Sequence, residues 1–171
     1  QWGLPEFKDY LKSFNPDLII NSRLQGYGDY KTPEQGIPIT RPEGMWEFCT
    51  TINTSWGYQH NDNHYKTLNQ IIRMFCDCIS MGGNMLLDIG PREDGTVDER
   101  QEAILLGLGK WVKAHEEAIF GTKEGIMQRY WQGGSTISES GDVLYLFVYD
   151  MPREHVCLKG LCNKIKKITV L

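Results

Sequence analysis

Two glutamates of this sequence stand where acid–base chemistry would need a carboxyl group. Glu34 lies in the middle of a long polar loop, directly after Pro33. Proline fixes the backbone angle of its own residue, which helps to aim the side chain that follows. Glu47 stands between Trp46 and Phe48 at the start of a predicted strand. Partial burial between aromatic rings raises the pKa of a carboxyl group, as a general acid requires.

Each of these glutamates also has a purely structural interpretation. From the local sequence alone, the solvated loop residue is the favoured interpretation of Glu34. For Glu47, a buried carboxylate bonded to an arginine or to the backbone is as good an interpretation as a general acid. A third carboxyl, Asp88, lies inside a predicted strand, and we expect it to order neighbouring polar groups. The local sequence alone leaves these alternatives open.

Three further residue types fit ligand binding. Arg23 ends a predicted strand and offers fixed donors to a substrate hydroxyl or carboxylate, or else a salt bridge across a barrel mouth. Trp56 fits either the apolar face of a sugar or a core position. His60 and His64 are four residues apart, but Asn61-Asp62-Asn63 between them indicates a loop. We therefore expect solvated histidines and no metal site.

The elements that position these residues follow from apolar spacing, turn residues and β-formers. A helix with apolar residues at 4, 7, 11 and 14 ends at Asn15-Pro16. The other predicted elements are buried strands at 18–20, 48–52 and 85–89, helices at 68–79 and from a Thr96/Glu99 capping box to His115, and antiparallel strands at 143–149, 156–158 and 165–171.

Buried strands that alternate with helices predict a parallel α/β sheet. A (β/α)₈ barrel needs eight such units, typically about 250 residues, and about three fit before Gly121. We therefore expect residues 1–122 to form the second half of a TIM-like barrel and residues 123–171 to begin an antiparallel β-sandwich. In a barrel, function collects beyond the carboxyl ends of the strands. That rule selects Arg23, the segment 53–64 and the loop after Ile89.

Composition excludes several classes of partner. The 171 residues include 18 Lys and Arg against 22 Asp and Glu, a net charge of −4, so no basic excess favours nucleic acid. The longest apolar run, Val143–Tyr149, falls far short of the roughly 20 residues of a membrane span. We expect no nucleic-acid partner and no membrane insertion. Aromatic residues make up 11% of the chain, which suits stacking on sugars.

The five cysteines do not have zinc-site spacing. Cys76 and Cys78 stand two apart in a predicted helix, so they point to nearly opposite faces, and we expect both to be buried thiols. Cys157 and Cys162 flank Leu-Lys-Gly-Leu, which is compatible with a hairpin disulfide or with free thiols. The sequon at Asn53 lies in an apolar stretch that we expect to be buried.

Six segments, in this order along residues 1 to about 122, together resemble the family 29 glycoside hydrolases, the retaining α-L-fucosidases. Any one of them alone is a weak signal, whereas the set is highly specific. The segments are Asp17-Leu18-Ile19-Ile20-Asn21-Ser22-Arg23, Gly28-Asp29-Tyr30-Lys31-Thr32-Pro33-Glu34-Gln35, Trp46-Glu47-Phe48-Cys49-Thr50-Thr51-Ile52, Ser55-Trp56-Gly57-Tyr58, Gly82-Gly83-Asn84-Met85-Leu86-Leu87-Asp88-Ile89-Gly90-Pro91 and Glu117-Ala118-Ile119-Phe120-Gly121-Thr122.

The resemblance implies a catalytic barrel followed by a β-sandwich, and an exo-acting enzyme that hydrolyses terminal α-L-fucosyl linkages of glycoconjugates by double displacement. Glu34 matches the acid/base position in the Thr-x-Glu loop of some members, and Glu47 matches the glutamate proposed in others. We favour Glu34, because a mobile loop reaches the aglycone side. Arg23 matches a fucose-contacting arginine, and Trp56 the aromatic residue that faces the C6 methyl group. No metal and no organic cofactor is implied.

The family nucleophile is an Asp in a Trp-x-Asp-Gly-x-Trp-like motif, whose last Trp resembles Trp2. We therefore expect the nucleophile just upstream of Gln1, and this segment alone to be inactive. The alternative is a non-catalytic, fucose-binding or pseudoenzyme relative. The implied partner is a fucosylated glycan, the implied location is secreted, periplasmic or lysosomal, and a homo-oligomer is left open.

Overall fold

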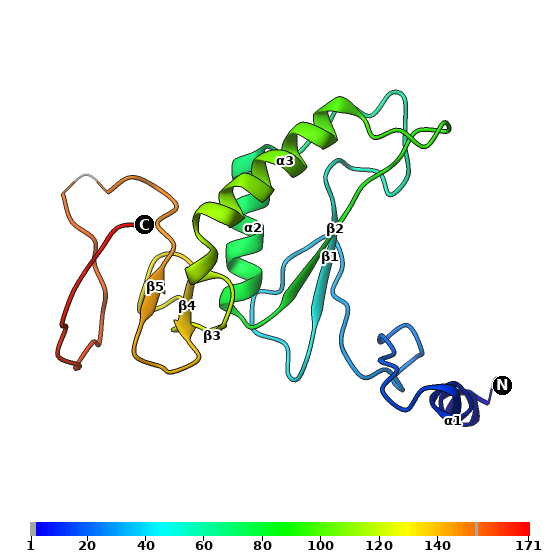
Figure 1. Ribbon diagram of the computed structural model, residues 1–171, viewed down its shortest axis with the longest axis horizontal. Helices are drawn as coiled ribbons and strands as arrows, with labels where there is room; N and C mark the ends of the chain where they lie inside the picture. The colour runs from blue at the N-terminus through cyan, green and yellow to red at the C-terminus, as the bar shows by residue number, and fades with distance from the viewer. Residues whose placement is uncertain (1–2, 153) are drawn as a thin grey trace.

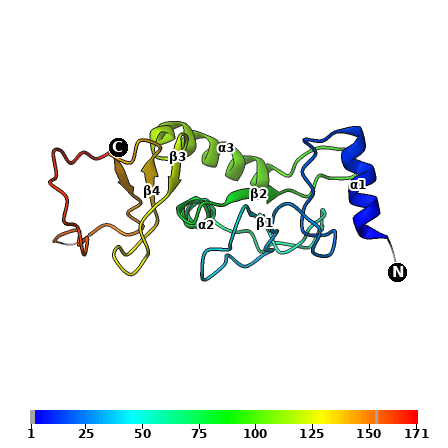
Figure 2. The same cartoon turned by 90° about the horizontal axis from the view of Figure 1, so that it is seen from below.

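The computed structural model describes residues 3–152 and 154–171. Helix α1 lies at one end of the molecule and the C-terminal coil at the other, in both views (Figure 1, Figure 2). The elements in chain order are α1 (Leu4–Phe14), β1 (Glu47–Thr51), α2 (Leu68–Ser80), β2 (Asn84–Asp88), α3 (Glu99–Ala114), a short 3₁₀ helix (Glu116–Ala118), β3 (Thr122–Glu124), β4 (Ser135–Ser138) and β5 (Leu144–Leu146). The chain is thus mixed α/β, as the sequence predicts.

Strands β1 and β2 pair in parallel, from Glu47 opposite Asn84 to Thr51 opposite Asp88. The chain before β1, from residue 21 to residue 34, runs parallel to this pair but forms only isolated bridges. Single parallel bridges join Asn21 to Tyr30, Lys31 to Trp46, and Glu34 to Cys49. Parallel chain segments therefore extend from residue 21 through residues 30–34 to β1 and β2.

Helix α2 covers one face of β1 and β2. Its first turn is closed by a reciprocal capping box between Thr67 and Gln70, which satisfies free N–H groups at the helix start. Trp46, directly before β1, and Phe48 of β1 form a buried cluster with Cys78 of α2. Gly83 allows the close approach of the Trp46 indole, since a Cβ there would lie 2.4 Å from Trp46 Cζ2. The face of the sheet that carries Trp46 and Phe48 is therefore the one that α2 covers.

The opposite side of α2 packs against a second sheet. Strands β3, β4 and β5 are antiparallel neighbours in that order, and α2 contacts β3, β4 and α3. Cys76 of α2 is buried with Ala118 and Phe147 in this second cluster. Cys76 and Cys78 therefore lie in different cores of the molecule, each at most 1% exposed, which confirms the prediction of buried thiols on opposite helix faces.

The predicted buried strand at 18–20 is wrong. These residues are not in a strand, and Ile19 is 66% exposed. The Ile20 N–H donates to the Asp29 carboxylate at 3.0 Å, and the Ile20 carbonyl accepts from the Asp29 N–H. Both backbone hydrogen bonds of Ile20 therefore go to one loop residue, Asp29. Among the described residues, no strand pairs with residues 18–20.

Two further strands and one cap also differ from the prediction. Residues 156–158 and 165–171 are coil, with Val170 98% exposed, and in the run 143–149 only β5 forms. β-Forming side chains do not make a strand where nothing pairs with them. The N-cap of α3 is Asp98, which accepts from the Arg100 N–H at 3.0 Å. Thr96 instead donates to Asp94.

Strand β2 is also less buried than expected, because Leu86 on its open face is 42% exposed. Among the residues that the structure describes, none of the helices combines the length and apolar composition that crossing a bilayer requires.

Candidate active site

The structure brings Arg23 and Glu34 together in an ion pair between their side chains. Arg23 is held in a turn, where its N–H donates to the Asn21 side chain at 3.1 Å. Glu34 is held because the flanking backbone bonds to Cys49: the Cys49 N–H donates to the carbonyl of Pro33 at 3.0 Å, and the Gln35 N–H to that of Cys49 at 2.8 Å.

Both side chains of this pair are accessible to a ligand, with Arg23 61% and Glu34 36% exposed. An exposed ion pair contributes little to stability, about 0–1 kcal/mol, so a ligand can replace one partner at low cost. The salt-bridge interpretation of Arg23 and its substrate-contact interpretation are therefore compatible.

Gln35 redirects the chain directly after Glu34. Its φ is +61°, in the left-handed region that non-glycine residues seldom occupy. Side-chain hydrogen bonds to β1 hold it there: its amide donates to Thr51 Oγ1 at 3.3 Å and accepts from Thr50 Oγ1 at 3.2 Å. Sequence reasoning did not identify this anchor, because nothing local marks Gln35 for positive φ.

Acidic side chains gather on the sheet face opposite α2. Parallel pairing puts Glu47, Cys49 and Asp88 on this face, since β1 residues alternate in direction and Thr51 lies opposite Asp88. The pKa of the Cys49 thiol is raised by burial and by the negative charges of Glu34, Asp88 and Glu47. Burial also raises the pKa of Asp88, which disfavours its charged form. The open face therefore gathers three carboxyl groups around Cys49.

Asp62 organises the loop that carries Trp56. Its carboxylate accepts from the His64 N–H at 3.0 Å and from the hydroxyls of Thr54 and Ser55 at 2.9 and 2.8 Å. These bonds, that from His64 first, lower the pKa of Asp62 to about 2. The Lys66 ammonium donates to the carbonyls of Thr51 and Asn53 at 2.6 and 3.2 Å. Our sequence reasoning treated Asp62 as a loop marker only and missed both anchors.

Trp56 itself lies in this loop, beyond the carboxyl end of β1, and is 43% exposed. It belongs to neither hydrophobic cluster. His60 and His64 are exposed loop residues, as expected. Asn53 is buried as predicted, at 3% exposure, whereas Thr54 of its sequon is exposed.

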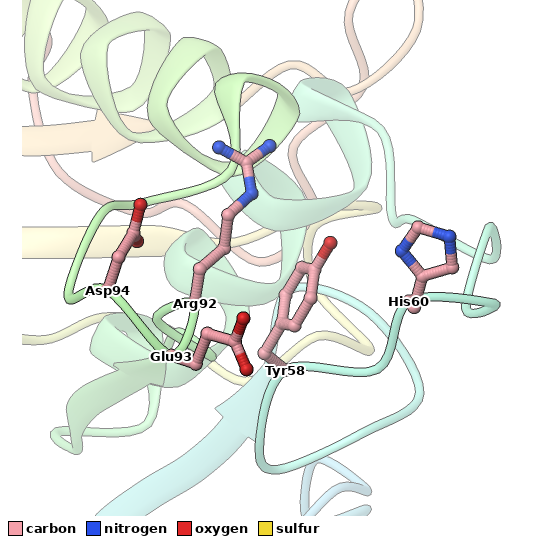
Figure 3. Close-up of a pocket in the computed structure, with 5 residues that line it drawn as sticks. All are labelled: Tyr58, His60, Arg92, Glu93 and Asp94. Atoms are coloured by element: carbon pink, nitrogen blue, oxygen red, sulfur yellow. The ribbon is translucent and has the colours of Figure 1, made fainter.

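A cavity of about 500 Å³ lies between the loops that follow β1 and β2, lined by Tyr58, His60, Arg92, Glu93 and Asp94 (Figure 3). The Arg92 guanidinium carbon lies 5.9 Å from the centre of the Tyr58 ring. Bonds to Glu99, and then to Tyr58, raise the pKa of Arg92. Sequence reasoning selected both loops but not these side chains.

The remaining predicted positions divide as follows. Arg23 and Glu34 are in contact, Glu47 lies on the same sheet face as Cys49, and Trp56 lies on the next loop. Trp2 lies outside the described residues. Cys157 and Cys162 are exposed free thiols. Among residues 3–152 and 154–171, no cluster of three or more His, Cys, Asp or Glu side chains is arranged to hold a metal ion.

Comparison with known proteins gives one family. The family model described as Alpha-L-fucosidase matches residues 1–117. Tissue alpha-L-fucosidase of Rattus norvegicus is 33% identical over 135 residues, 71% of this chain and 29% of the relative. That of Homo sapiens is 28% identical, covering 99% of this chain and 40% of the relative. The chain thus spans roughly a third of the length of these relatives.

Solved structures give the same result. The crystal structure of alpha-L-fucosidase from Vibrio sp. strain EJY3 matches 95% of this chain and 30% of its own, with a TM-score of 0.87 and 29% identity. A trapped covalent intermediate of a glycoside hydrolase family 29 alpha-L-fucosidase from Bacteroides thetaiotaomicron, in complex with 2-fluoro-fucosyl fluoride, matches 89% of this chain and 40% of its own, with a TM-score of 0.77 and 26% identity.

Proposed function

Because the chain belongs to the alpha-L-fucosidase family, we propose that the protein is an exo-acting, retaining α-L-fucosidase that hydrolyses terminal α-L-fucosyl linkages of glycoconjugates. The observation that carries this proposal is the accessible Arg23–Glu34 pair, which lies on the open sheet face within the segment matched by the family. A carboxyl group beside a guanidinium supplies both a proton-transfer group and fixed donors for sugar hydroxyls.

In this proposal Glu34 is the acid/base. It donates a proton to the glycosidic oxygen as a nucleophilic Asp attacks the anomeric carbon, and it then removes a proton from the water that hydrolyses the fucosyl–enzyme ester. The trapped covalent intermediate named for the Bacteroides relative supports a double displacement. We assign the nucleophile to the motif that ends at Trp2, just upstream of Gln1.

Arg23 and Trp56 bind the fucosyl ring in this proposal. When a fucoside occupies the site, the Arg23 guanidinium donates to sugar hydroxyls in place of Glu34, which frees the Glu34 carboxyl for the leaving oxygen. Trp56, on the loop anchored by Asp62 and Lys66, packs against the C6 methyl group. Glu47, on the same sheet face as Cys49, is the alternative acid/base.

The same proposal covers organisation and setting. We assign residues 1–122 to the second half of a (β/α)₈-like barrel and residues 123–171 to the start of a β-sandwich. The parallel segments up to β2 and the antiparallel sheet that begins at Thr122 support this division. The partner is a fucosylated glycan, the setting is secreted, periplasmic or lysosomal, and a homo-oligomer is compatible with it.

The test compares Glu34→Ala with Glu47→Ala in the full-length protein, on a natural fucoside and on an aryl α-L-fucoside with a good leaving group. We expect Glu34→Ala to lose about 10²–10⁴-fold on the natural fucoside, to keep more activity on the aryl fucoside, and to be rescued by azide. Azide replaces water as a nucleophile that needs no general base, so only the true acid/base variant responds.

Rescue of Glu47→Ala instead would transfer the role to Glu47. Fucose binding without hydrolysis by the wild-type protein would overturn the enzyme proposal and indicate a non-catalytic, fucose-binding relative.

A further inference from the structure

The two loops that form the cavity, after β1 and after β2, pack directly against each other. Gly90 packs directly against the backbone of Gly57 and Tyr58, and a Cβ at Gly90 would lie 2.5 Å from the Tyr58 nitrogen. The Gly90 N–H donates to the side-chain carbonyl of Gln101 at 3.1 Å, and Gln101 is fully buried. Gly90 thus packs the loop after β2 directly on the loop after β1, and a buried helix residue holds Gly90 in place.

The cavity walls have the chemistry that sugar rings need. Tyr58 stands between Arg92 and His60 (Figure 3), so an aromatic ring is flanked by polar groups. Aromatic faces pack on the C–H surfaces of a pyranose, while polar side chains bond to its hydroxyls. The volume of about 500 Å³ lies within the range of small-molecule sites, roughly 300–1,000 Å³.

The cavity also adjoins the residues assigned to fucose. Tyr58 follows Trp56 by two residues in one loop, and two residues of extended chain span at most about 7 Å. The cavity therefore begins beside the residue assigned to the fucosyl ring, within reach of the sugar that is linked to a bound fucose.

The charge around the cavity is one-sided. The guanidinium of Arg92 is bonded to Asp98 at 3.1 Å and to Glu99 at 2.7 Å, so its charge is already matched. Glu93 and Asp94 are exposed, and neither forms an ion pair within the part of the chain that the structure describes. The rim therefore carries unmatched negative charge.

We propose that this cavity binds the leaving-group sugar ring, with Tyr58 as its stacking platform, and that Glu93 and Asp94 make it favour neutral over sulfated or other anionic glycans. The inference rests on the proposed function and adds to it the residues that determine leaving-group specificity.

The first experiment measures kcat/KM of the full-length protein on a neutral fucosylated trisaccharide and on α-L-fucosyl fluoride, whose leaving group has no ring to stack. We expect Tyr58→Ala to lower the trisaccharide value about five- to tenfold, in line with one lost aromatic contact, and to affect the fluoride much less. Tyr58→Phe keeps the ring and should stay within about twofold of wild type. Tyr130→Ala, at an exposed tyrosine that does not line the cavity, is the matched control and should not change the ratio.

The second experiment compares the trisaccharide with its sulfated form. We expect Glu93→Lys to raise the relative kcat/KM for the sulfated substrate about three- to fivefold at low salt, and less at high salt, because exposed charges are screened. His60→Ala, on an exposed loop, should lower the trisaccharide value with the fold intact. These two variants decide the proposal if Tyr58→Ala does not fold.

The outcomes separate the two proposals. Hydrolysis of neither substrate by the wild-type protein would overturn the proposed function, and this inference with it. Hydrolysis of both substrates, with ratios that none of the variants changes, would overturn the leaving-group site alone. An equal loss on both substrates for Tyr58→Ala would also overturn it, because Tyr58 would then serve the fucose itself or the fold.

Discussion

Two arginine–carboxylate clusters of this molecule use the same side-chain types in opposite ways. Arg23 and Glu34 pair on the open sheet face, where solvent reaches both. At the joint between α2 and the antiparallel sheet, the Tyr149 hydroxyl donates to Asp77 at 2.6 Å. Arg73 donates there to the Tyr149 carbonyl at 2.6 Å, and its guanidinium carbon lies 5.5 Å from the Tyr149 ring centre. We call this second set the joint cluster.

The difference between the clusters lies in their surroundings. Burial raises the pKa of Asp77 even though Tyr149 and Arg73 oppose that rise, and burial followed by Asp77 raises the pKa of Tyr149. A buried polar group that loses its partner keeps its desolvation cost, whereas an exposed one regains water. The exposed pair is therefore suited to exchanging partners with a ligand, and the joint cluster to fixing two sheets on one helix.

The sharpest test makes the same substitution in both clusters of the full-length protein. Arg23→Leu should lower kcat/KM on aryl fucoside about 100-fold, since it removes charge-assisted bonds to the sugar, and change the free energy of unfolding by less than about 1 kcal/mol. Arg73→Leu should lower the free energy of unfolding by about 1–3 kcal/mol and leave kcat/KM within a few-fold. Denaturant unfolding and steady-state kinetics measure the two effects. If both variants lost activity equally and had equal free energies of unfolding, the two clusters would not differ in role.

A smaller effect isolates one bond of the joint cluster. Tyr149→Phe removes the hydroxyl that donates to Asp77 and should lower the free energy of unfolding by about 1–2 kcal/mol. Tyr145→Phe, on neighbouring β5, is the matched control and should cost less, since burial rather than a hydrogen-bond partner is the main influence on the pKa of Tyr145. Equal losses would mean that the Tyr149–Asp77 bond adds no stability.

The smallest effect concerns how stability depends on pH: the contributions of Asp62 and Asp77 to the free energy of unfolding should change with pH in opposite directions. The pKa of Asp62 falls to about 2 in the folded chain, so its stabilisation is present above pH 4 and is lost as the pH falls toward 2. The pKa of Asp77 is raised, so its contribution favours folding at acid pH and declines as the pH rises through the folded value. Unfolding free energies measured across pH 2–7 should therefore converge with wild type at low pH for Asp62→Asn. For Asp77→Asn, the unfolding free energy of the variant relative to wild type should rise from acid to neutral pH. Slopes of one sign for both variants would contradict the assigned environments.

Local pattern was enough to predict most of the elements. Apolar spacing gave α1 and α2 nearly to the residue, and the short apolar runs located β1 and β2. Prediction failed where two local signals competed or where a partner decides the outcome. Asp98 and Thr96 are both good N-caps two residues apart, and only the fold selects Asp98. The run 165–171 has β-forming residues, but a strand needs a neighbour.

The candidate site divides in the same way. Arg23, Glu34, Glu47 and Trp56 were identified from residue type and position, and their roles stay proposals. Asp62, Lys66 and Gln101 were missed because each bonds to residues that are seven or more positions away in the sequence. Lys66 bonds to carbonyls at the end of β1, and Gln101 to a loop eleven residues away. Such partners follow from chain geometry rather than from any local motif.

Helix α2 has a consequence for how the molecule comes apart. Cys78 is buried in the cluster of β1, and Cys76 in the cluster of the antiparallel sheet. A helix with both sides buried cannot leave one sheet without weakening its hold on the other. The parallel and antiparallel sheets should therefore lose their structure in one cooperative transition, with the two thiols becoming open to alkylation at the same rate.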